Sequence, residues 1–406
     1  MMSSCQNAAM VYHRRIISFL YALLVCSGLA IGVGAATPVK NSVVANIATP
    51  PPNNKQNAVD INKKPKNDAA PSVVHWGYNY PDHPPSATGS GAEEELTPEK
   101  WKEKFPQCDS SRKNSRQSPV AIDTKSIRAG SDPQRDALKA SSYEEEPSKS
   151  VWNAVNTGHG VQFSANWAHT PEIYDGGLPG HYTFTQFHFH WGGINGRGSE
   201  HIIDGKPSAL ELHLVHRRSY ESDLEATRDP VGLAVVGVLF EVSNQDKQLR
   251  TVEPFPPHLD LLLSTLNELD QPDAKRDLVL KGFRLVDLLP ANRTFYRYMG
   301  SLTTPPCSEA AIWSVMATPL KIPEKYLLAF RKLHSKKTKP GNTKDDLLVD
   351  NFRPVQPLAG RNVSVYMLRP VTHSMQRSIE GNLRPINISR QLSIPEEQHA
   401  PDVFVF

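Results

Sequence analysis

The sequence has no long run of charge of one sign. Its 45 Lys and Arg residues nearly balance its 42 Asp and Glu residues, and the formal net charge is only +3. The chain therefore lacks the basic or acidic blocks that mark charged interaction tails. From this balance we expect no nucleic acid partner.

Aromatic residues are missing from residues 37–72, which are rich in Pro, Asn and Lys. Such a segment cannot bury enough apolar surface to order itself, so we predict a disordered stalk there. After this segment, aromatic residues resume at Trp76 and continue to Tyr366, which predicts a single folded domain over residues 73–370. Residues 371–406 form a polar C-terminal tail with two isolated aromatic residues, Phe404 and Phe406.

The N-terminal 36 residues have the pattern of a targeting segment. Arg14 and Arg15 precede an uncharged apolar stretch from Ile16 to Ala36. This pattern is typical of a cleaved signal peptide, and its length also suits an uncleaved signal anchor. Everything C-terminal is exported under either interpretation, because the two arginines stay inside. We expect a secreted protein or, alternatively, a single-pass type II membrane protein with an extracellular domain; only the second touches a membrane.

Cysteine is scarce. Cys5 and Cys26 lie in the targeting segment, so only Cys108 and Cys307 remain in the rest of the chain. In an oxidising compartment two cysteines predict one disulfide, and two reduced buried thiols are the alternative. Asn292, Asn362 and Asn387 each begin an Asn-x-Ser/Thr triplet, which makes them candidates for N-glycosylation.

Within the domain, the strongest periodicity is two, in short runs separated by Gly, Pro and Asn. Residues 182–191 are predicted to be a strand with Phe187, Phe189 and Trp191 on one face. Its other face carries a polar and histidine-containing set: Tyr182, Phe184, Gln186, His188 and His190. A second strand, residues 209–216, places Glu211, His213 and Val215 opposite Leu210, Leu212 and Leu214.

Residues 232–240 are apolar almost throughout, which favours a central strand, although a buried helical segment has the same pattern. Helical patterns are few, chiefly residues 259–269 and 324–335. We therefore predict a mainly β (α+β) domain with short peripheral helices.

The two histidine-bearing strands suggest a metal site. A His-x-His pair places two imidazoles on one face of a strand, and His213 on the neighbouring strand can complete a set of three. Three neutral imidazoles leave the fourth position of Zn²⁺ open, which characterises a catalytic site. Gln186 and Glu211 each precede a ligand by two residues, so each can orient an imidazole. Histidines that are merely satisfied polar residues beside a core are the competing interpretation.

Six motifs, in order and at similar spacing, make the chain from about His75 to Pro370 resemble the α-class carbonic anhydrases of the secreted or membrane-anchored type. They are His75-Trp76-Gly77-Tyr78, Arg116-Gln117-Ser118-Pro119-Val120, Gln186-Phe187-His188-Phe189-His190-Trp191-Gly192, Gly198-Ser199-Glu200-His201, Ala209-Leu210-Glu211-Leu212-His213-Leu214-Val215-His216 and Gly300-Ser301-Leu302-Thr303-Thr304-Pro305-Pro306. The resemblance implies a single domain with a central, twisted, mostly antiparallel sheet of about ten strands.

The resemblance also implies a function, the reversible hydration of CO₂ to bicarbonate and a proton by zinc-hydroxide attack. It assigns Zn²⁺ to His188, His190 and His213, hydroxide orientation to Thr303 and Glu200, and proton transfer to His159. By the same resemblance, Asn351 lies beside a ligand, and Tyr78 and Gln162 line a water chain. It also implies a Cys108–Cys307 disulfide and cis bonds at Ser118-Pro119 and Pro305-Pro306. The residues implied to surround the substrate are Val215, Val235, Leu302, Thr304, Ala311 and Trp313.

Three positions depart from the family pattern. Ala311 and Thr157 stand where many members have valine and asparagine, and Phe352 replaces a usual tryptophan. A rival from another class is an inactive anhydrase-like binding module. Retention of the three histidines with Thr303 and Glu200 argues against that rival.

Overall fold

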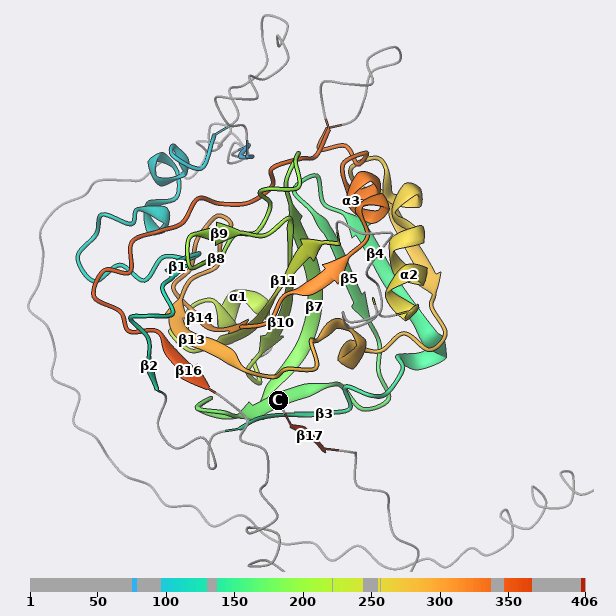
Figure 1. Cartoon of the computed structure of the whole chain (residues 1–406), viewed down its shortest axis with the longest axis horizontal. Coiled ribbons are helices and arrows are strands. Elements are labelled where there is room, and N and C mark those ends of the chain that lie inside the picture. The colour runs from blue at the N-terminus through green and yellow to red at the C-terminus, as the bar shows by residue number, and fades with distance from the viewer. Residues whose placement is uncertain are drawn as a thin grey trace, which may run out of the picture. The chain divides into compact units, whose positions relative to one another are not determined.

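In the computed structural model, three long neighbouring strands form the centre of a mixed β-sheet (Figure 1). They are β7 (Tyr182–Trp191), β10 (Leu210–Arg217) and β11 (Leu233–Val242). The predicted strands at residues 182–191, 209–216 and 232–240 are thereby confirmed to within two residues at each end. The apolar run of the third is a strand and not a helix, and its residues from Leu233 to Phe240 are all buried.

The structure describes residues 75–78, 96–129, 137–220, 222–243, 255, 257–336, 347–366 and 403–405. They belong to one unit that runs from Pro71 to Phe406. The predicted targeting segment (residues 1–36), the stalk (37–72), most of the tail (371–406) and Asn387 lie outside them. No helix within the described residues is both long and apolar enough to cross a membrane.

The large sheet has 14 strands. Ten form one continuous path, in the order β12-β4-β5-β7-β10-β11-β14-β13-β16-β2. Along this path the pairs are antiparallel except β11–β14 and β16–β2. The other strands of the path are β12 (Lys275–Val279), β4 (Val151–Asn156), β5 (Val161–Ala165), β14 (Ala311–Met316), β13 (Phe295–Gly300), β16 (Ser364–Tyr366) and β2 (Arg128–Ala129).

Four shorter strands join this path at its sides, which the expectation of about ten strands did not include. They are β15 on β11, β6 on β7, β3 on β6 and β17 on β3. Each has three or four residues, too few for a recognisable period of two: β15 (Leu320–Ile322), β6 (Glu172–Asp175), β3 (Leu138–Ser141) and β17 (Val403–Val405).

The remaining elements are short. A separate three-stranded sheet contains β1 (Ala121–Ile122), β8 (Ile202–Ile203) and β9 (Lys206–Pro207). The helices are η1 (Trp101–Glu103), η2 (Pro106–Cys108), η3 (Ser148–Ser150), α1 (Asp223–Ala226), α2 (Pro257–Ser264), η4 (Leu266–Leu269), η5 (Leu285–Leu288) and α3 (Glu324–Phe330). The prediction of a mainly β domain with short helices is confirmed.

The helical pattern at residues 259–269 forms two pieces, α2 and η4, instead of one helix. Between them the hydroxyls of Ser264 and Thr265 donate to the carbonyls of Leu261 and Leu262, three residues back. Such side-chain bonds compete with the helical ladder. The pattern at 324–335 is a helix only to Phe330, because the chain then turns and His334 forms a β-bridge with Leu347.

Alternate residues of β10 enter two different clusters, one on each face of the sheet. Leu210, Leu212 and Leu214 belong to the main core, which the helices α2, η4 and α3 cover. Val215, on the opposite face, belongs to a second cluster with Val235 and Trp313. The period of two thus separates the apolar face of the strand from the face that carries Glu211 and His213.

The face assignment of β7 is wrong for two residues. Tyr182 and Phe184 are buried in the main core together with Phe187 and Phe189, not on the histidine face. The register against β10 shifts here, since Val215 pairs with Gln186 but His216 pairs with Phe184. One extra residue in β7, a β-bulge, changes the phase of the side chains, as expected of such a bulge.

Candidate metal centre

Strand register brings the three predicted ligands together. His188 on β7 lies directly opposite His213 on β10, and His190 projects from the same face of β7 two residues on. One nitrogen from each of the three rings lies within 4.8 Å of the others. His190 and His213 are buried and His188 is partly exposed, so the group is open to solvent on the side of His188.

The remaining nitrogen of each ring has a hydrogen-bond acceptor, which fixes the tautomer. His188 Nδ1 donates to Gln186 Oε1 at 2.9 Å, His190 Nδ1 to the carbonyl of Asn351 at 2.7 Å, and His213 Nε2 to Glu211 Oε1 at 2.8 Å. With these tautomers, His188 Nε2, His190 Nε2 and His213 Nδ1 carry lone pairs, and His188 Nε2 lies 3.3 Å from His213 Nδ1. Gln186, Glu211 and Asn351 therefore occupy the places expected of residues that orient ligands.

This donor set fits Zn²⁺. Burial, together with the neighbouring His190 and His213, holds the pKa of His188 well below its usual range, and burial also lowers the pKa of His190. Neutral imidazoles are the form that binds metal. His190 Nε2 is buried and has no hydrogen-bond partner within the described part of the chain. Three imidazole nitrogens that converge on a point open to solvent on the fourth side are the arrangement of a zinc site with a free fourth coordination position.

A hydrogen-bond chain continues behind His213. Glu211 Oε1 contacts His201 Nδ1 at 2.6 Å, and His201 Nε2 contacts the Tyr298 hydroxyl at 2.7 Å. Burial alone would raise the pKa of Glu211, but its interactions with the imidazoles of His201 and His213, including a hydrogen bond to each, hold that pKa well below its usual value. His201, Glu211 and His213 also form a compact group of possible ligands, but their facing atoms already bond to one another.

Gly237 makes room for this chain. It lies opposite His213 on β11, and a Cβ there would stand 3.2 Å from Glu211 Oε1 and 3.7 Å from the Trp313 ring. A side chain at this position would press on the carboxylate that orients His213. The glycine inside an otherwise apolar strand therefore serves the metal centre.

The hydrogen-bond chain reaches the loop that carries Thr303. The Tyr298 hydroxyl donates to Ser118 Oγ at 2.9 Å, and the backbone N–H of Ser301 donates to the same oxygen at 3.0 Å. The Trp313 indole donates to the carbonyl of Ser301 at 3.0 Å. These hydrogen bonds connect Ser301, the residue before Leu302 and Thr303, to the hydrogen-bond chain behind the metal ligands.

Glu200 and Thr303 are both buried. Glu200 Oε1 accepts the backbone N–H of Arg353 at 2.9 Å. Glu200 Oε2 is buried with no hydrogen-bond partner among the described residues, and no bond to Thr303 is formed. Glu200 Oε2 also lies 3.9 Å from His213 Nε2, which places this free acceptor beside the ligand group.

The predicted substrate residues mostly gather in the second cluster, on the ligand side of the sheet. Val215, Val235 and Trp313 lie side by side in register across β10, β11 and β14. Ala311 and the partly buried Leu302 belong to the same cluster. The Trp313 ring meets His213 edge to face, with centroids 4.7 Å apart. Thr304 is partly exposed and is not part of this cluster.

His159 lies in the turn between β4 and β5. Its ring stacks on Trp76, with centroids 3.8 Å apart and planes at 7°. The side chain of Asn351 donates to the carbonyl of His159 at 3.0 Å. Thr157 accepts the N–H of His159 and donates to Gly160, so threonine closes the turn where the family often has asparagine.

The two residues predicted to line a water chain have different neighbours. Gln162 pairs with His188 across β5 and β7. Tyr78 is buried beside Trp76 and Trp101, with ring centroids 5.9 and 5.6 Å away.

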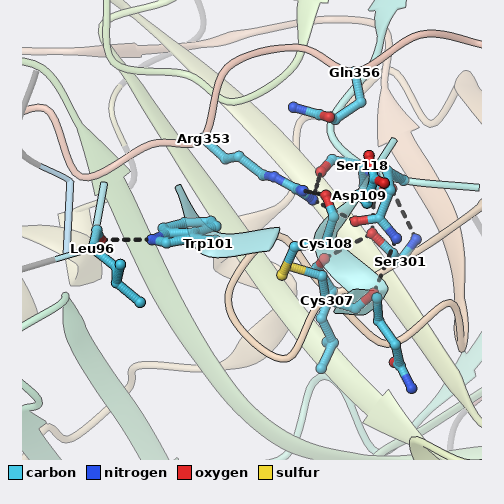
Figure 2. Close-up of a disulfide and its surroundings, with 12 residues drawn as sticks. Leu96, Trp101, Cys108, Asp109, Ser118, Ser301, Cys307, Arg353 and Gln356 are labelled. Carbon is cyan, nitrogen blue, oxygen red and sulfur yellow. Dashed lines mark hydrogen bonds between the residues drawn. A yellow bond between two sulfur atoms is a disulfide. The ribbon is translucent and has the colours of Figure 1, made fainter. Parts of the chain in front are cut away.

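The predicted disulfide between Cys108 and Cys307 is formed, across a sequence separation of 199 (Figure 2). Cys307 lies on the same loop as Thr303, and its N–H donates to the carbonyl of Thr304 at 2.8 Å. The Arg353 side chain donates to the carbonyls of Cys108 and Ser118 (Figure 2). Because its backbone N–H donates to Glu200, it connects both segments to that residue. The cis bonds at Ser118-Pro119 and Pro305-Pro306 are also present.

Sequence reasoning assigned no role to His201, Tyr298 or Trp76, although two of them stand in recognised motifs. Their roles depend on contacts over long sequence separations, such as the 97 residues between His201 and Tyr298. The only local signal was the position of His201 directly after Glu200.

Of the glycosylation candidates, Asn292 and Asn362 are exposed.

Comparisons with known proteins agree with this geometry. Residues 96–367 match the family described as eukaryotic-type carbonic anhydrase. The chain is 35% identical to carbonic anhydrase 7 of Mus musculus over 294 residues, which cover 71% of this chain and 96% of the mouse protein. It is 34% identical to putative carbonic anhydrase 3 of Caenorhabditis elegans over 249 residues, 61% of this chain and 88% of the relative. This chain therefore belongs to the eukaryotic-type carbonic anhydrase family.

Proposed function

We propose that this protein is an active zinc enzyme that catalyses the reversible hydration of CO₂ to bicarbonate and a proton. The observation that carries the proposal is the convergence of three bare imidazole nitrogens beside an apolar wall. Bound zinc would supply a nucleophile at neutral pH by lowering the pKa of its water. The protein residues hold the ion, provide a surface for an apolar substrate and move the proton.

Val215, Val235 and Trp313 supply the surface for CO₂. The molecule is small and has no net dipole, so an apolar wall next to the metal can hold it where a polar wall would favour water. Trp313 contacts the ligand His213 directly, so the wall begins at the metal centre. Alanine at position 311, where many family members have valine, leaves more space beside this wall and keeps the wall apolar.

Thr303 and Glu200 are proposed to orient the attacking group. The free, buried Glu200 Oε2 is an acceptor that the Thr303 hydroxyl can satisfy, and a hydroxyl that donates there offers its lone pair to the reacting oxygen. A Thr303→Ala variant should lose about a hundredfold in kcat/KM, as expected for lost alignment, while Thr303→Ser keeps most of it. Equal losses in both variants would argue against this role for the hydroxyl.

His159 is proposed to pass the proton to buffer. An imidazole titrates near neutral pH and suits this transfer. Its turn is tied to the metal centre, because Asn351 contacts both the His159 carbonyl and the ligand His190. Tyr78, which packs on the same Trp76 as His159, and Gln162, which pairs with His188, are proposed to order the intervening water.

We also propose export of the domain. The apolar stretch after Arg14 and Arg15, the Cys108–Cys307 disulfide and the exposed Asn292 and Asn362 all support it. N-terminal sequencing of protein recovered from the medium distinguishes a cleaved signal from an anchor. A mobility shift after glycosidase treatment tests the two asparagines, and Asn387 as well. Retention of the full chain in the cytosol would contradict the proposal.

A stopped-flow assay of CO₂ hydration tests the main proposal. The purified protein should be active, lose activity with a zinc chelator, and regain it when Zn²⁺ is added. His213→Ala should neither bind zinc nor hydrate CO₂, whereas His181→Ala, an exposed histidine on another part of the domain, should do both. A folded, zinc-loaded chain without activity would favour the anhydrase-like binding module instead.

A further inference from the structure

The C-terminal end of the chain forms a strand of the large sheet. β17 pairs antiparallel with β3 (Figure 1), in the register Val403 with Ser141, Phe404 with Ala140 and Val405 with Lys139. Strand β17 comes from the tail that the sequence marks as polar apart from its last aromatic residues. Neither the metal centre nor the apolar wall uses this pairing.

β3 would be an edge strand without β17. Its other side pairs with β6, and β6 continues to β7 at two register positions only. An edge strand presents unpaired N–H and C=O groups, which invite pairing with another chain. β17 therefore covers the side of β3 that the other described strands leave open.

The two strands suit this pairing. β3 is firmly placed, because Leu138 and Ala140 are buried in the main core and Lys139 bonds to Asp175 at 2.9 Å. Val403, Phe404 and Val405 are residue types with high β-propensity. They follow Pro401 and Asp402, which end the polar tail. A short β-forming segment at the end of a polar tail is suited to strand addition, in which main-chain bonds provide the affinity.

We propose that the open side of β3 is a strand-docking site and that its occupant is the C-terminal segment Val403–Val405 of the same chain. Residues 367–402 connect β16 to β17, and their 36 residues reach far more than the width of a domain. Because this segment belongs to the same chain, its docking is intramolecular and does not depend on the protein concentration. A three-residue strand then binds reversibly and caps the edge of β3.

Hydrogen exchange compares the full chain with a chain that ends at Ala400. The β3 amides that do not bond to β6 should exchange about tenfold faster in the shortened chain, because local opening no longer requires release of β17. A synthetic peptide of residues 399–406 should restore slow exchange at millimolar concentration. The same peptide should leave the full chain unchanged, since its site is occupied. Equal CO₂ hydration by both chains verifies that the shortened domain is folded.

Proline variants of the full chain provide the matched controls. Phe404→Pro should act like the shortened chain, because proline cannot take a normal place in a ladder. Glu397→Pro, outside β17, should behave like the parent. Equal exchange in parent, shortened chain and Phe404→Pro would overturn the proposal, as would a peptide without effect. Light scattering tests whether the strand comes from the same chain or from a second copy. If a dimer dissociates on dilution and the slow exchange of the β3 amides disappears with it, a second copy provides the strand, and the proposal is overturned.

Discussion

The imidazole of His159 lies flat on the indole of Trp76, with 3.8 Å between the ring centroids. Trp76 in turn meets Tyr78 and Trp101 edge to face. The proposed proton-transfer group is therefore stacked on an aromatic cluster formed by the start of the domain, while Asn351 holds its backbone from the metal side.

His159→Ala should slow CO₂ hydration by about a hundredfold in dilute buffer, because the proposed general acid and base is removed. The metal centre stays intact, so added imidazole should restore much of the rate. Stopped-flow turnover at increasing buffer concentration is the measurement. His169→Ala removes a largely exposed histidine elsewhere and is the control. A rate that does not depend on buffer in His159→Ala would contradict the shuttle role.

Glu211→Gln should weaken zinc binding about tenfold to a hundredfold, as is usual when a residue that orients a ligand is changed. The carboxylate accepts from His213 and holds its Nδ1 toward the other two rings. Zinc affinity is measured by competition with a chromophoric chelator. Glu172→Gln, which changes a partly exposed carboxylate on β6, should bind zinc like the parent. Equal affinities of Glu211→Gln and the parent would exclude this orienting role.

Replacing Cys108 and Cys307 together by alanine should lower the free energy of unfolding by about 5 kcal/mol. A cross-link over 199 residues removes much entropy from the unfolded chain, and the chain-entropy model gives this magnitude for such a loop. Urea titrations of the variant and of the oxidised parent measure the difference. The parent with its disulfide reduced should resemble the variant, and a variant as stable as the oxidised parent would contradict the expectation.

The domain should lose stability as the pH falls below 6.5, partly through His216. Burial lowers the pKa of His216 to about 3, and its ring bonds to Tyr143 and to the carbonyl of Ala234. The unfolded chain takes up this proton near pH 6.5 and the folded chain does not, so protonation favours unfolding below that pH. The loss attributable to this residue is about 2 kcal/mol at pH 5.

Urea unfolding of the metal-free protein at several pH values tests this expectation, since zinc release would otherwise add its own pH dependence. His216→Gln should show a shallower fall in stability between pH 6.5 and pH 4.5 than the parent. His181→Gln, which changes an exposed histidine, should keep the parent's slope. Parallel curves for parent and His216→Gln would rule out the contribution.

Several features of the domain could be predicted from the sequence because their causes are local. The period of two placed His188 and His190 on one face of a strand and the leucines of residues 210–214 on the opposite face of the next. Glu211 and Gln186 lie two residues before their ligands, so their orienting bonds also follow from strand geometry. Motif order indicated the family, and the disulfide followed from having two cysteines left.

Other features were decided only when distant segments met. The β-bulge that moves Tyr182 and Phe184 into the main core depends on the register against β10. The chain from Glu211 through His201 to Tyr298 joins residues far apart in sequence, as does the pairing of β17 with β3. Local preferences act over a few neighbouring residues, whereas register and long-range hydrogen bonds depend on how the whole sheet packs. The sequence by itself therefore determined which residues can bind zinc, and the tertiary structure decided what supports them.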